Sequence, residues 1–277
     1  MAPRRSPIFP FQRWLGAQRR QRLRLWLTLV RRELEAQYQG SVLGNAWPLL
    51  NQLSQLLIYT FIFSIILKSR PALASLGDST MGYGLWLFCG LLPWIAFTNG
   101  FSRAATAVIR QPNLVKKVVF PLNLLPLVDP GVAMVESAFG TLALLVATAI
   151  AGVNLQGALW LPLLWLPQFL LTAGLAYLLA GLTVYLRDIP QVVGVSLNLW
   201  FYLTPIVYPL SLIPEPWRGL LLTVNPMAQL VELYRGVLFE QQFQGGLWLK
   251  FTAIAVILFW LGRRCFQRLQ PGFADIL

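Results

Sequence analysis

The sequence contains no histidine. Histidine is the usual general base at neutral pH and a common metal ligand, so its absence excludes Ser-His and Cys-His catalytic pairs and histidine metal sites. The sequence also lacks a GxxxxGK[ST] loop, which would bind nucleotide phosphates, and it has no HExxH or GxSxG pattern. We therefore expect a chain that performs no bond chemistry, does not hydrolyse ATP by itself and binds no metal.

Charged residues are scarce as well, at 12% of 277 residues against the ~25% typical of soluble domains. Hydrophobic residues make up 57%, and the mean hydropathy is +0.62, so the sequence predicts an integral membrane protein. The two cysteines, Cys89 and Cys265, lie far apart without CxxC spacing, which favours two free thiols over a disulfide. The arginine-rich N-terminus contains no apolar run of the kind found in a cleaved signal peptide.

Positive charge dominates among the few charged residues, with a net charge of +12. A basic chain could bind nucleic acid. Here, however, long apolar runs separate the basic residues. Anionic lipid head groups and membrane topology explain such a distribution better, so we expect a membrane surface and no nucleic acid as the partner.

Charge-free apolar runs predict an all-α fold with six transmembrane helices, each approaching the ~20 residues needed to cross hydrocarbon. The predicted spans are 46–67, 83–102, 124–150, 158–184, 191–210 and 247–262. The chain then divides into an N-terminal tail and helix, a transmembrane domain and a C-terminal tail, at 1–45, 46–262 and 263–277. With both termini in the cytoplasm, 17 of the 22 Lys and Arg residues fall on the inner side, as the positive-inside rule requires.

Two segments outside these spans have distinctive patterns. Residues 18–39 predict an amphipathic helix lying in the membrane interface, because its apolar side chains share one face and its charges lie off that face. The apolar face consists of Leu23, Trp26, Leu27, Val30 and Leu34, and the charges are Arg24, Arg31, Arg32 and Glu35, with Arg31 and Glu35 spaced for an i,i+4 pair. The three arginines would anchor the helix on anionic lipid or attract a lipid pyrophosphate.

The second segment, residues 206–240, is apolar but interrupted by four prolines and several charges, and Pro205 precedes it. It predicts two short helices, at about 215–223 and 227–240, that dip into the membrane from the outer side before the last span. Such broken helices are tolerated at membrane depth only against protein or water.

A basic island follows the second span, in the predicted cytoplasmic loop 103–121. Pro112 and Pro121 bracket about two predicted helical turns, and Asn113 could cap the helix start. The island is either a solvated loop or a docking helix for a partner protein. Its apolar residues alternate with two lysines, in the order Leu114, Val115, Lys116, Lys117, Val118 and Phe120.

Two carboxylates, Asp129 and Glu136, lie within the third span and on one face, because they are seven residues apart. A structural ion pair or hydrogen bond is the preferred interpretation and a proton relay the alternative. The sequence does not identify a partner cation.

Aromatic residues gather in the first and fifth spans, where an aromatic belt or core packing is the simplest explanation. The flat rings could also line a path for sugars, on whose faces they stack. The residues concerned are Tyr59, Phe63, Trp200, Phe201, Tyr202 and Tyr208.

Several stretches resemble the membrane subunit of polysaccharide-exporting ABC transporters, the family that exports O-antigen, capsule and teichoic acid. They are Arg31–Trp47 with its Ser-Val-Leu-Gly, Gly90-Leu-Leu-Pro-Trp94, Asn113–Pro121, Arg187-Asp188, Leu199–Tyr208, Asn225-Pro-Met227 and Tyr234-Arg-Gly236. These stretches occur in the family's order. One departure is Asn51-Gln52, where the family would have Asn-Pro.

The resemblance implies a homodimer with two copies of a separate ATP-binding subunit, which would hold ATP and Mg. It implies that residues 113–121 dock on that subunit and that lipid-linked polysaccharide crosses the inner membrane between the two copies. A permease for teichoic acid, a drug or a small lipid would share this topology. A membrane-embedded transferase using Asp129 and Glu136 is the more distant alternative.

Overall fold

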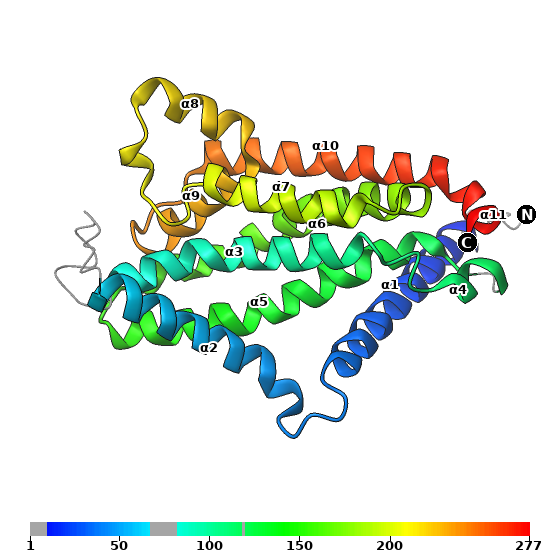
Figure 1. Ribbon diagram of the computed structural model, residues 1–277, viewed down its shortest axis with the longest axis horizontal. Helices are drawn as coiled ribbons and strands as arrows, with labels where there is room; N and C mark the ends of the chain where they lie inside the picture. The colour runs from blue at the N-terminus through cyan, green and yellow to red at the C-terminus, as the bar shows by residue number, and fades with distance from the viewer. Residues whose placement is uncertain (1–9, 67–81, 118–119) are drawn as a thin grey trace, which may run out of the picture.

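The computed structural model describes residues 10–66, 82–117 and 120–277, and every regular element within these ranges is helical (Figure 1). The predicted all-α fold class is confirmed at that level. The helices are α1 Pro10–Gln37, α2 Trp47–Tyr59, α3 Gly82–Ala104, α4 Pro112–Lys117, α5 Leu125–Ile150, α6 Leu161–Tyr185, α7 Ile189–Leu203, α8 Glu215–Val224, α9 Pro226–Leu238, α10 Gly245–Leu269 and α11 Phe273–Ile276.

Four helices within the described ranges are long and apolar enough to cross a membrane, counted with their flanking turns. They are Gly82–Ala104, Leu122–Ile150, Gln156–Tyr185 and Gly245–Ile276, and they match the second, third, fourth and sixth predicted spans. The first predicted span corresponds to α2 and the π-helical segment Thr60–Ile66 that continues it, while residue 67 lies outside the described residues. The protein is therefore a multi-pass membrane protein.

The fifth predicted span is shorter than expected. The prediction of 191–210 was wrong at its end, because α7 stops at Leu203 and Thr204 is extended. Thr204 precedes Pro205, and a residue before proline is disfavoured in the helical conformation. The 15 residues of α7 cover ~22 Å at ~1.5 Å each, less than the ~30 Å of bilayer hydrocarbon.

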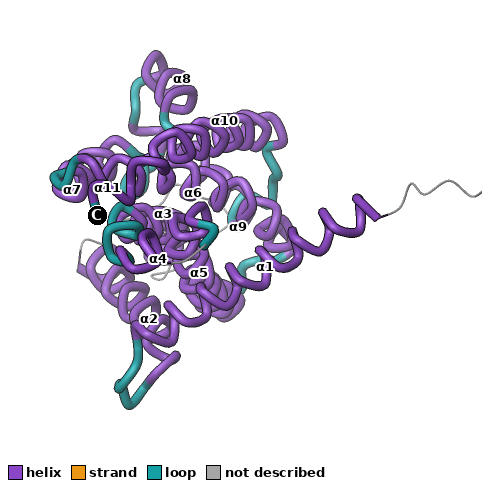
Figure 2. Tube along the Cα trace, turned by 90° about the vertical axis from the view of Figure 1, so that its right-hand side faces the viewer, coloured by secondary structure: helices purple, strands orange, loops and turns teal. Residues whose placement is uncertain are grey.

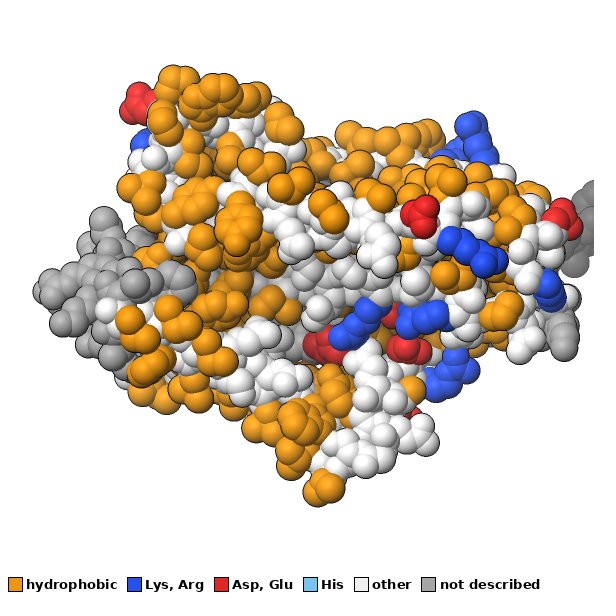
Figure 3. Space-filling model, in the orientation of Figure 1, with side chains coloured by type: hydrophobic (Ala, Val, Ile, Leu, Met, Phe, Trp, Pro, Cys, Tyr) orange, Lys and Arg blue, Asp and Glu red, His pale blue; other side chains and the backbone are white. Residues whose placement is uncertain are grey.

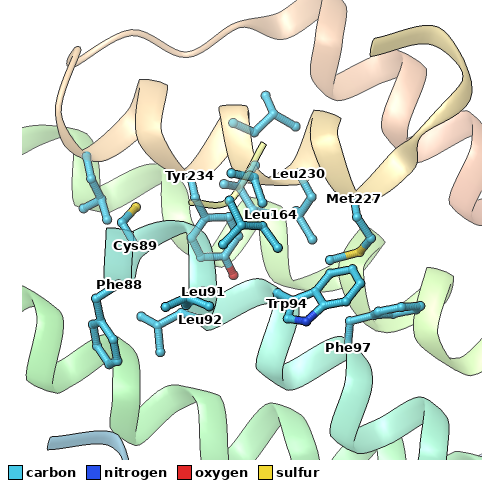
Figure 4. Packing of buried hydrophobic residues seen from close by; sticks show 14 of the residues in the cluster. Phe88, Cys89, Leu91, Leu92, Trp94, Phe97, Leu164, Met227, Leu230 and Tyr234 are labelled. Atoms are coloured by element: carbon cyan, nitrogen blue, oxygen red, sulfur yellow. The ribbon is translucent and has the colours of Figure 1, made fainter. Parts of the chain in front are cut away.

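Helix α3 lies at the centre of the bundle, surrounded by α2, α5, α6 and α7 in the end-on view of Figure 2. Up to Phe97 it is apolar on all sides, which is the pattern of a fully buried helix, and 18 of its 23 residues are buried. Figure 4 shows α9 packed on it, with Tyr234, Leu230 and Met227 above Leu91 and Trp94. Helix α3 is thus the central helix on which the others pack.

Helices α6 and α10 form the tightest pair of the bundle, with backbones close together at Gly174 and Gly262. A Cβ atom at Gly174 would come within 2.6 Å of the Phe259 Cα, and one at Gly262 would overlap the Gly174 backbone. Small residues at a helix contact allow this approach in membrane proteins.

Helix α1 leaves the bundle sideways (Figure 2) and contacts α5 through Trp26, Leu29 and Val30. The Trp26 indole N–H donates to the Leu127 carbonyl at 3.0 Å. Leu23 and Leu27, which we placed on the same apolar face, point away and are 55% and 52% exposed. The helix therefore presents apolar side chains both to α5 and to its surroundings, as an interfacial helix would.

The two short helices predicted before the last span exist as α8 and α9, but their surroundings differ. Every residue of α9 is buried except Glu232, whereas α8 contains no buried residue. The two cysteines, Cys89 and Cys265, are free thiols, as predicted.

The helices define two ends of the molecule. Helix α4, the C-terminal helix α11 and the start of α1 lie at one end in Figure 1, which we call the α4 end. Helices α8 and α9 and the connection between α5 and α6 lie at the other, which we call the α9 end.

Candidate functional site

Two arginines at the α4 end pair with the two carboxylates of α5. The Arg110 Nη2 lies 2.8 Å from the Asp129 Oδ2, and the Arg103 Nη1 lies 3.3 Å from the Glu136 Oε1. Arg103 and Arg110 are seven residues apart, and so are Asp129 and Glu136. The two arginines therefore face the two acids with matching spacing. The structure thus supplies the cations that the sequence did not identify.

Helix α1 joins this group through Glu33, whose Oε1 lies 3.8 Å from the Arg110 Nη1. Arg110 also donates to the backbone carbonyl of Arg103 at 3.2 Å. One side chain therefore connects α1, the loop before α4 and α5. Figure 3 shows red and blue side chains in contact on this face, beside the apolar surface of the bundle. We call Glu33, Arg103, Arg110, Asp129 and Glu136 the charged cluster.

Burial makes these pairs obligatory for the acids. Asp129 is 1% exposed and Glu136 is 5% exposed, and an unpaired charge at such depth costs several kcal/mol. The side chains of Arg110 and Arg103 are 43% and 34% exposed, so water or head groups reach them. This arrangement favours the structural role over a proton relay, because each acid is already engaged by a guanidinium.

Tyr38, between α1 and α2, also reaches Glu136, and its hydroxyl donates to the Glu136 Oε1 at 3.4 Å. Burial, together with the neighbouring Glu136 carboxylate, raises the pKa of Tyr38. The phenol therefore stays protonated at neutral pH and remains a donor.

A polar pocket opens next to Glu136, between α2, α3 and α5. Its volume is about 270 Å³, and it is lined by Tyr38, Pro48, Asn51, Gln52, Ser54, Gln55, Ile95, Asn99, Arg103 and Glu136. The side-chain oxygens of Gln52 and Gln55 are buried, and within the described part of the chain neither has a hydrogen-bond partner. We did not predict this pocket, although four polar residues within Asn51–Gln55 were a visible signal at the start of a predicted span.

The docking segment is more closely attached to its own chain than we expected. Val115 packs against the cluster formed by Val108, Phe266 and Phe273, and Phe120 packs against Leu29 and its neighbours on α1 and α5. Two of the four apolar side chains expected to face a partner therefore face this chain, at least in part.

What remains accessible on α4 is mainly polar. Asn113 and Lys116 are exposed, and Leu114 is half-buried. We predicted that Asn113 caps the helix start, which requires a position before the first turn. The helix begins at Pro112, so Asn113 lies within the first turn instead. Pro121 is half-buried and follows the helix, while Val118 and the Lys117 side chain lie outside the described residues.

The aromatic residues expected to line a path do not share one surface. Trp200 and Phe201 point into the core, with ring centroids 6.2 and 5.6 Å from that of Trp94. Tyr59 packs on the same core, whereas Tyr202 is 71% exposed. The Tyr208 hydroxyl donates to the Tyr202 carbonyl at 2.8 Å, and the side chain of Phe63 lies outside the described part.

Helix α1 presents its arginines outward. Arg24, Arg31 and Arg32 are exposed, and Arg31 forms the predicted i,i+4 pair with Glu35 at 2.8 Å. Arg32 also lines a shallow pocket beside Glu33 and Arg110. This position suits contact with anionic head groups.

The α9 end contains a buried arginine whose contacts we did not predict, although Tyr234-Arg-Gly236 was among the stretches that resemble the family. Arg235 is 3% exposed and donates to the carbonyls of Pro205 and Ile206, each at 2.6 Å. Its Nη1 lies 3.4 Å from the Glu232 Oε1, and its guanidinium stacks 3.4 Å from the Trp86 ring centroid. A lone arginine in an apolar helix is the signal that could have identified it.

Comparison with known proteins places these features in a family context. Residues 24–239 match the family described as ABC-2 type transporter. The chain is 32% identical to an O-antigen export system permease, RfbA, of Myxococcus xanthus over 91% of this chain and 94% of that protein. It is 27% identical to the protein of the same name from Klebsiella pneumoniae, over 91% and 95%. The Escherichia coli polysialic acid transport protein KpsM is 23% identical over 83% and 87%.

Proposed function

We propose that this chain, which belongs to the ABC-2 type transporter family, forms the channel of an ATP-driven polysaccharide exporter. Its cargo would be a lipid-linked, O-antigen-like polysaccharide that moves outward across the cytoplasmic membrane. The observation that carries this proposal is the 32% identity to an O-antigen export permease over 91% of this chain and 94% of the relative.

The proposed exporter contains two copies of this chain and two copies of a separate ATP-binding subunit, which holds ATP and Mg. The sequence has no phosphate-binding loop of its own, which supports a partner ATPase. Helix α7 supports the homodimer, because it exposes Ser196 and Asn198 beside Val195 and Leu199. Polar side chains in a membrane helix usually face protein or a wet cavity.

A channel between two copies would solve the main physical problem of polysaccharide transport. Each sugar hydroxyl left without a partner in hydrocarbon costs roughly several kcal/mol. The exposed polar side chains of α7, the Tyr202 ring and the polar pocket at the α4 end would replace water along the route.

The proposed topology has six spans, a re-entrant α8–α9 pair, and both termini in the cytoplasm. The helix ends that carry Arg103, Arg263, Arg264 and Arg268 then lie on the inner side, as the positive-inside rule favours. A reporter enzyme fused after Leu277 should be active only in the cytoplasm. Periplasmic activity would exclude this topology.

Docking of the ATP-binding subunit is proposed at α4, through the exposed Asn113 and Lys116 and the half-buried Leu114. Substitution Lys116→Glu combined with Leu114→Asp should abolish co-purification of the ATPase while leaving the chain in the membrane. The matched control is Lys250→Glu, which changes an exposed lysine on α10 away from α4. Intact co-purification of the double variant would place the contact elsewhere.

The function is tested in cells that make the polymer and lack this gene. We expect polymer to accumulate on the cytoplasmic side and to reach the surface when the chain and its ATPase are restored together. Restored drug resistance or lipid export without polymer export would support a small-molecule permease instead. Modification of a lipid-linked sugar by the purified chain alone would support a transferase.

A further inference from the structure

We infer that the polar pocket between α2, α3 and α5 is a binding subsite for a neutral, hydroxyl-rich unit of the cargo, a single sugar ring. This inference rests on the proposed function and adds a place in the chain where one part of the cargo is recognised. It comes from the side chains that line the pocket and from the polar atoms that they leave without partners.

The strongest observation is a pair of unsatisfied acceptors. Gln52 is 6% exposed, yet its Oε1 has no donor within the described residues, and the same holds for the buried Oε1 of Gln55. Each oxygen has almost no accessible surface, and that of Gln52 lies beside Gly140 of α5, so a donor in the pocket reaches these acceptors once the glutamine side chains turn toward it. Both residues line the pocket.

The rest of the lining matches a ligand that both donates and accepts. Asn51, Asn99 and Ser54 can both donate and accept hydrogen bonds. Arg103 can only donate, and Tyr38 mainly donates. A sugar hydroxyl is a donor and an acceptor at once. Several such hydroxyls on one ring would pair with the asparagine amides and, once the glutamine side chains turn, with the two glutamine oxygens.

The charges in the pocket select a neutral ligand over an anionic one. Its single cation, Arg103, is already paired with its single anion, Glu136, at 3.3 Å. A pyrophosphate or an acidic head group would require an uncompensated positive charge, and the exposed arginines of α1 provide that instead. The sugar and the lipid phosphate would therefore be held at different places.

The size of the pocket agrees with one sugar unit. Its volume of about 270 Å³ is far more than the ~30 Å³ of a water molecule. It is close to the lower limit of ~300 Å³ for pockets that take small ligands. The pocket includes Arg103 at the end of α3 that leads to α4, so cargo coming from the cytoplasm would meet it before the α9 end.

A cysteine protection experiment tests occupation directly. In a Cys265→Ser background, which leaves only the fully buried Cys89, Ser54→Cys places a thiol on the pocket wall. Membranes from cells that make the lipid-linked polymer, with the partner ATPase inactivated, are treated with a maleimide and compared with membranes from cells that make none. We expect labelling to slow about fivefold when polymer is present, and no change at the control Thr223→Cys on α8.

Equal labelling of Ser54→Cys with and without polymer would overturn the subsite. If the same variant still exports polymer with an active ATPase, the proposed function stands and only the subsite fails. If the unmodified chain does not support polymer export, the proposed function itself fails.

A second measurement separates recognition from folding. Gln52→Leu and Gln55→Leu keep the side-chain volume but remove the acceptors. We expect the export rate per folded chain to fall about fivefold, as the loss of about one net hydrogen bond implies. The control is Thr252→Val on α10, which removes another buried, unpaired oxygen, outside the pocket. Export by the glutamine variants equal to that of the control would overturn the subsite.

Discussion

The two ends of the molecule each pair an arginine with a carboxylate, but they do so in opposite environments. At the α9 end, Arg235 is 3% exposed and contacts two carbonyls, Glu232 and the Trp86 ring, while its Nε has no hydrogen-bond partner within the described residues. At the α4 end, the side chains of Arg103 and Arg110 are 34% and 43% exposed and serve buried acids. The same pair of residue types thus forms a closed contact at one end and an open one at the other.

This difference indicates which contacts can change during a transport cycle. Separating Arg235 from its partners would leave a charge and two carbonyls unsolvated in a low dielectric, which is expensive. Separating Arg110 from Asp129 costs less on the arginine side, because water already reaches that guanidinium, although the buried Asp129 would lose its cation. We therefore interpret the α9 end as a fixed clamp and the α4 end as the part that can rearrange when the ATPase acts.

The largest effect is expected from breaking the clamp. Arg235→Leu should lower the free energy of unfolding by ~3–5 kcal/mol, because it leaves Glu232, which is only 18% exposed, without its cation and two carbonyls without their donor. Thermal unfolding of the detergent-solubilised protein, followed by size-exclusion chromatography, measures the loss. Arg264→Leu is the control, since Arg264 also lies over a tryptophan ring, that of Trp260 at 4.9 Å, but is exposed. Similar losses in both variants would contradict the clamp interpretation.

A smaller effect is expected at the Arg110–Asp129 pair. A double-mutant cycle with Arg110→Gln and Asp129→Asn should give a coupling energy of ~1–2 kcal/mol, less than at Arg235 because solvent screens the exposed guanidinium. The same thermal assay, applied to the two single variants and the double variant, provides the coupling. A coupling energy as large as the Arg235→Leu loss would remove the contrast between the two ends.

The next effect in size is expected at the Arg103–Glu136 pair, which borders the pocket. Here we expect export to change more than stability. Glu136→Gln leaves Arg103 without its anion and gives the pocket a net positive charge. Export per folded chain should fall several-fold while unfolding shifts by about 1 kcal/mol. Arg103→Lys keeps the charge balance and should retain most of the export activity. Equal export by Glu136→Gln and the unmodified chain would contradict a role for the charge balance.

The smallest effect is expected at the Arg31–Glu35 pair on α1, which is exposed on both sides. Water solvates both side chains as well as their partner does, so Glu35→Gln should leave the unfolding temperature unchanged. A clear destabilisation would show that α1 contributes electrostatic stability beyond its contacts with α5.

Helix existence could be predicted well because it depends on local patterns. The bounds of α5 agree with the predicted third span to within one residue, since the apolar run there ends at a glycine turn, where Gly152 adopts a φ of 75°. The end of α7 was missed because we followed hydropathy through Thr204 and gave too little weight to Pro205.

The site was harder to predict, because pairing depends on which helices become neighbours. Asp129 and Glu136 were correctly placed on one face. The matching spacing of Arg103 and Arg110 gains meaning only once the end of α3 is known to lie against α5. The polar run Asn51–Gln55 likewise becomes a pocket only when α3 and α5 close it.

The glycine contact between α6 and α10 has a mechanical consequence. Where two backbones touch, van der Waals repulsion rises so steeply that neither helix can slide or roll until the pair first separates. Helices α6 and α10 therefore move as one rigid unit along the length of the bundle.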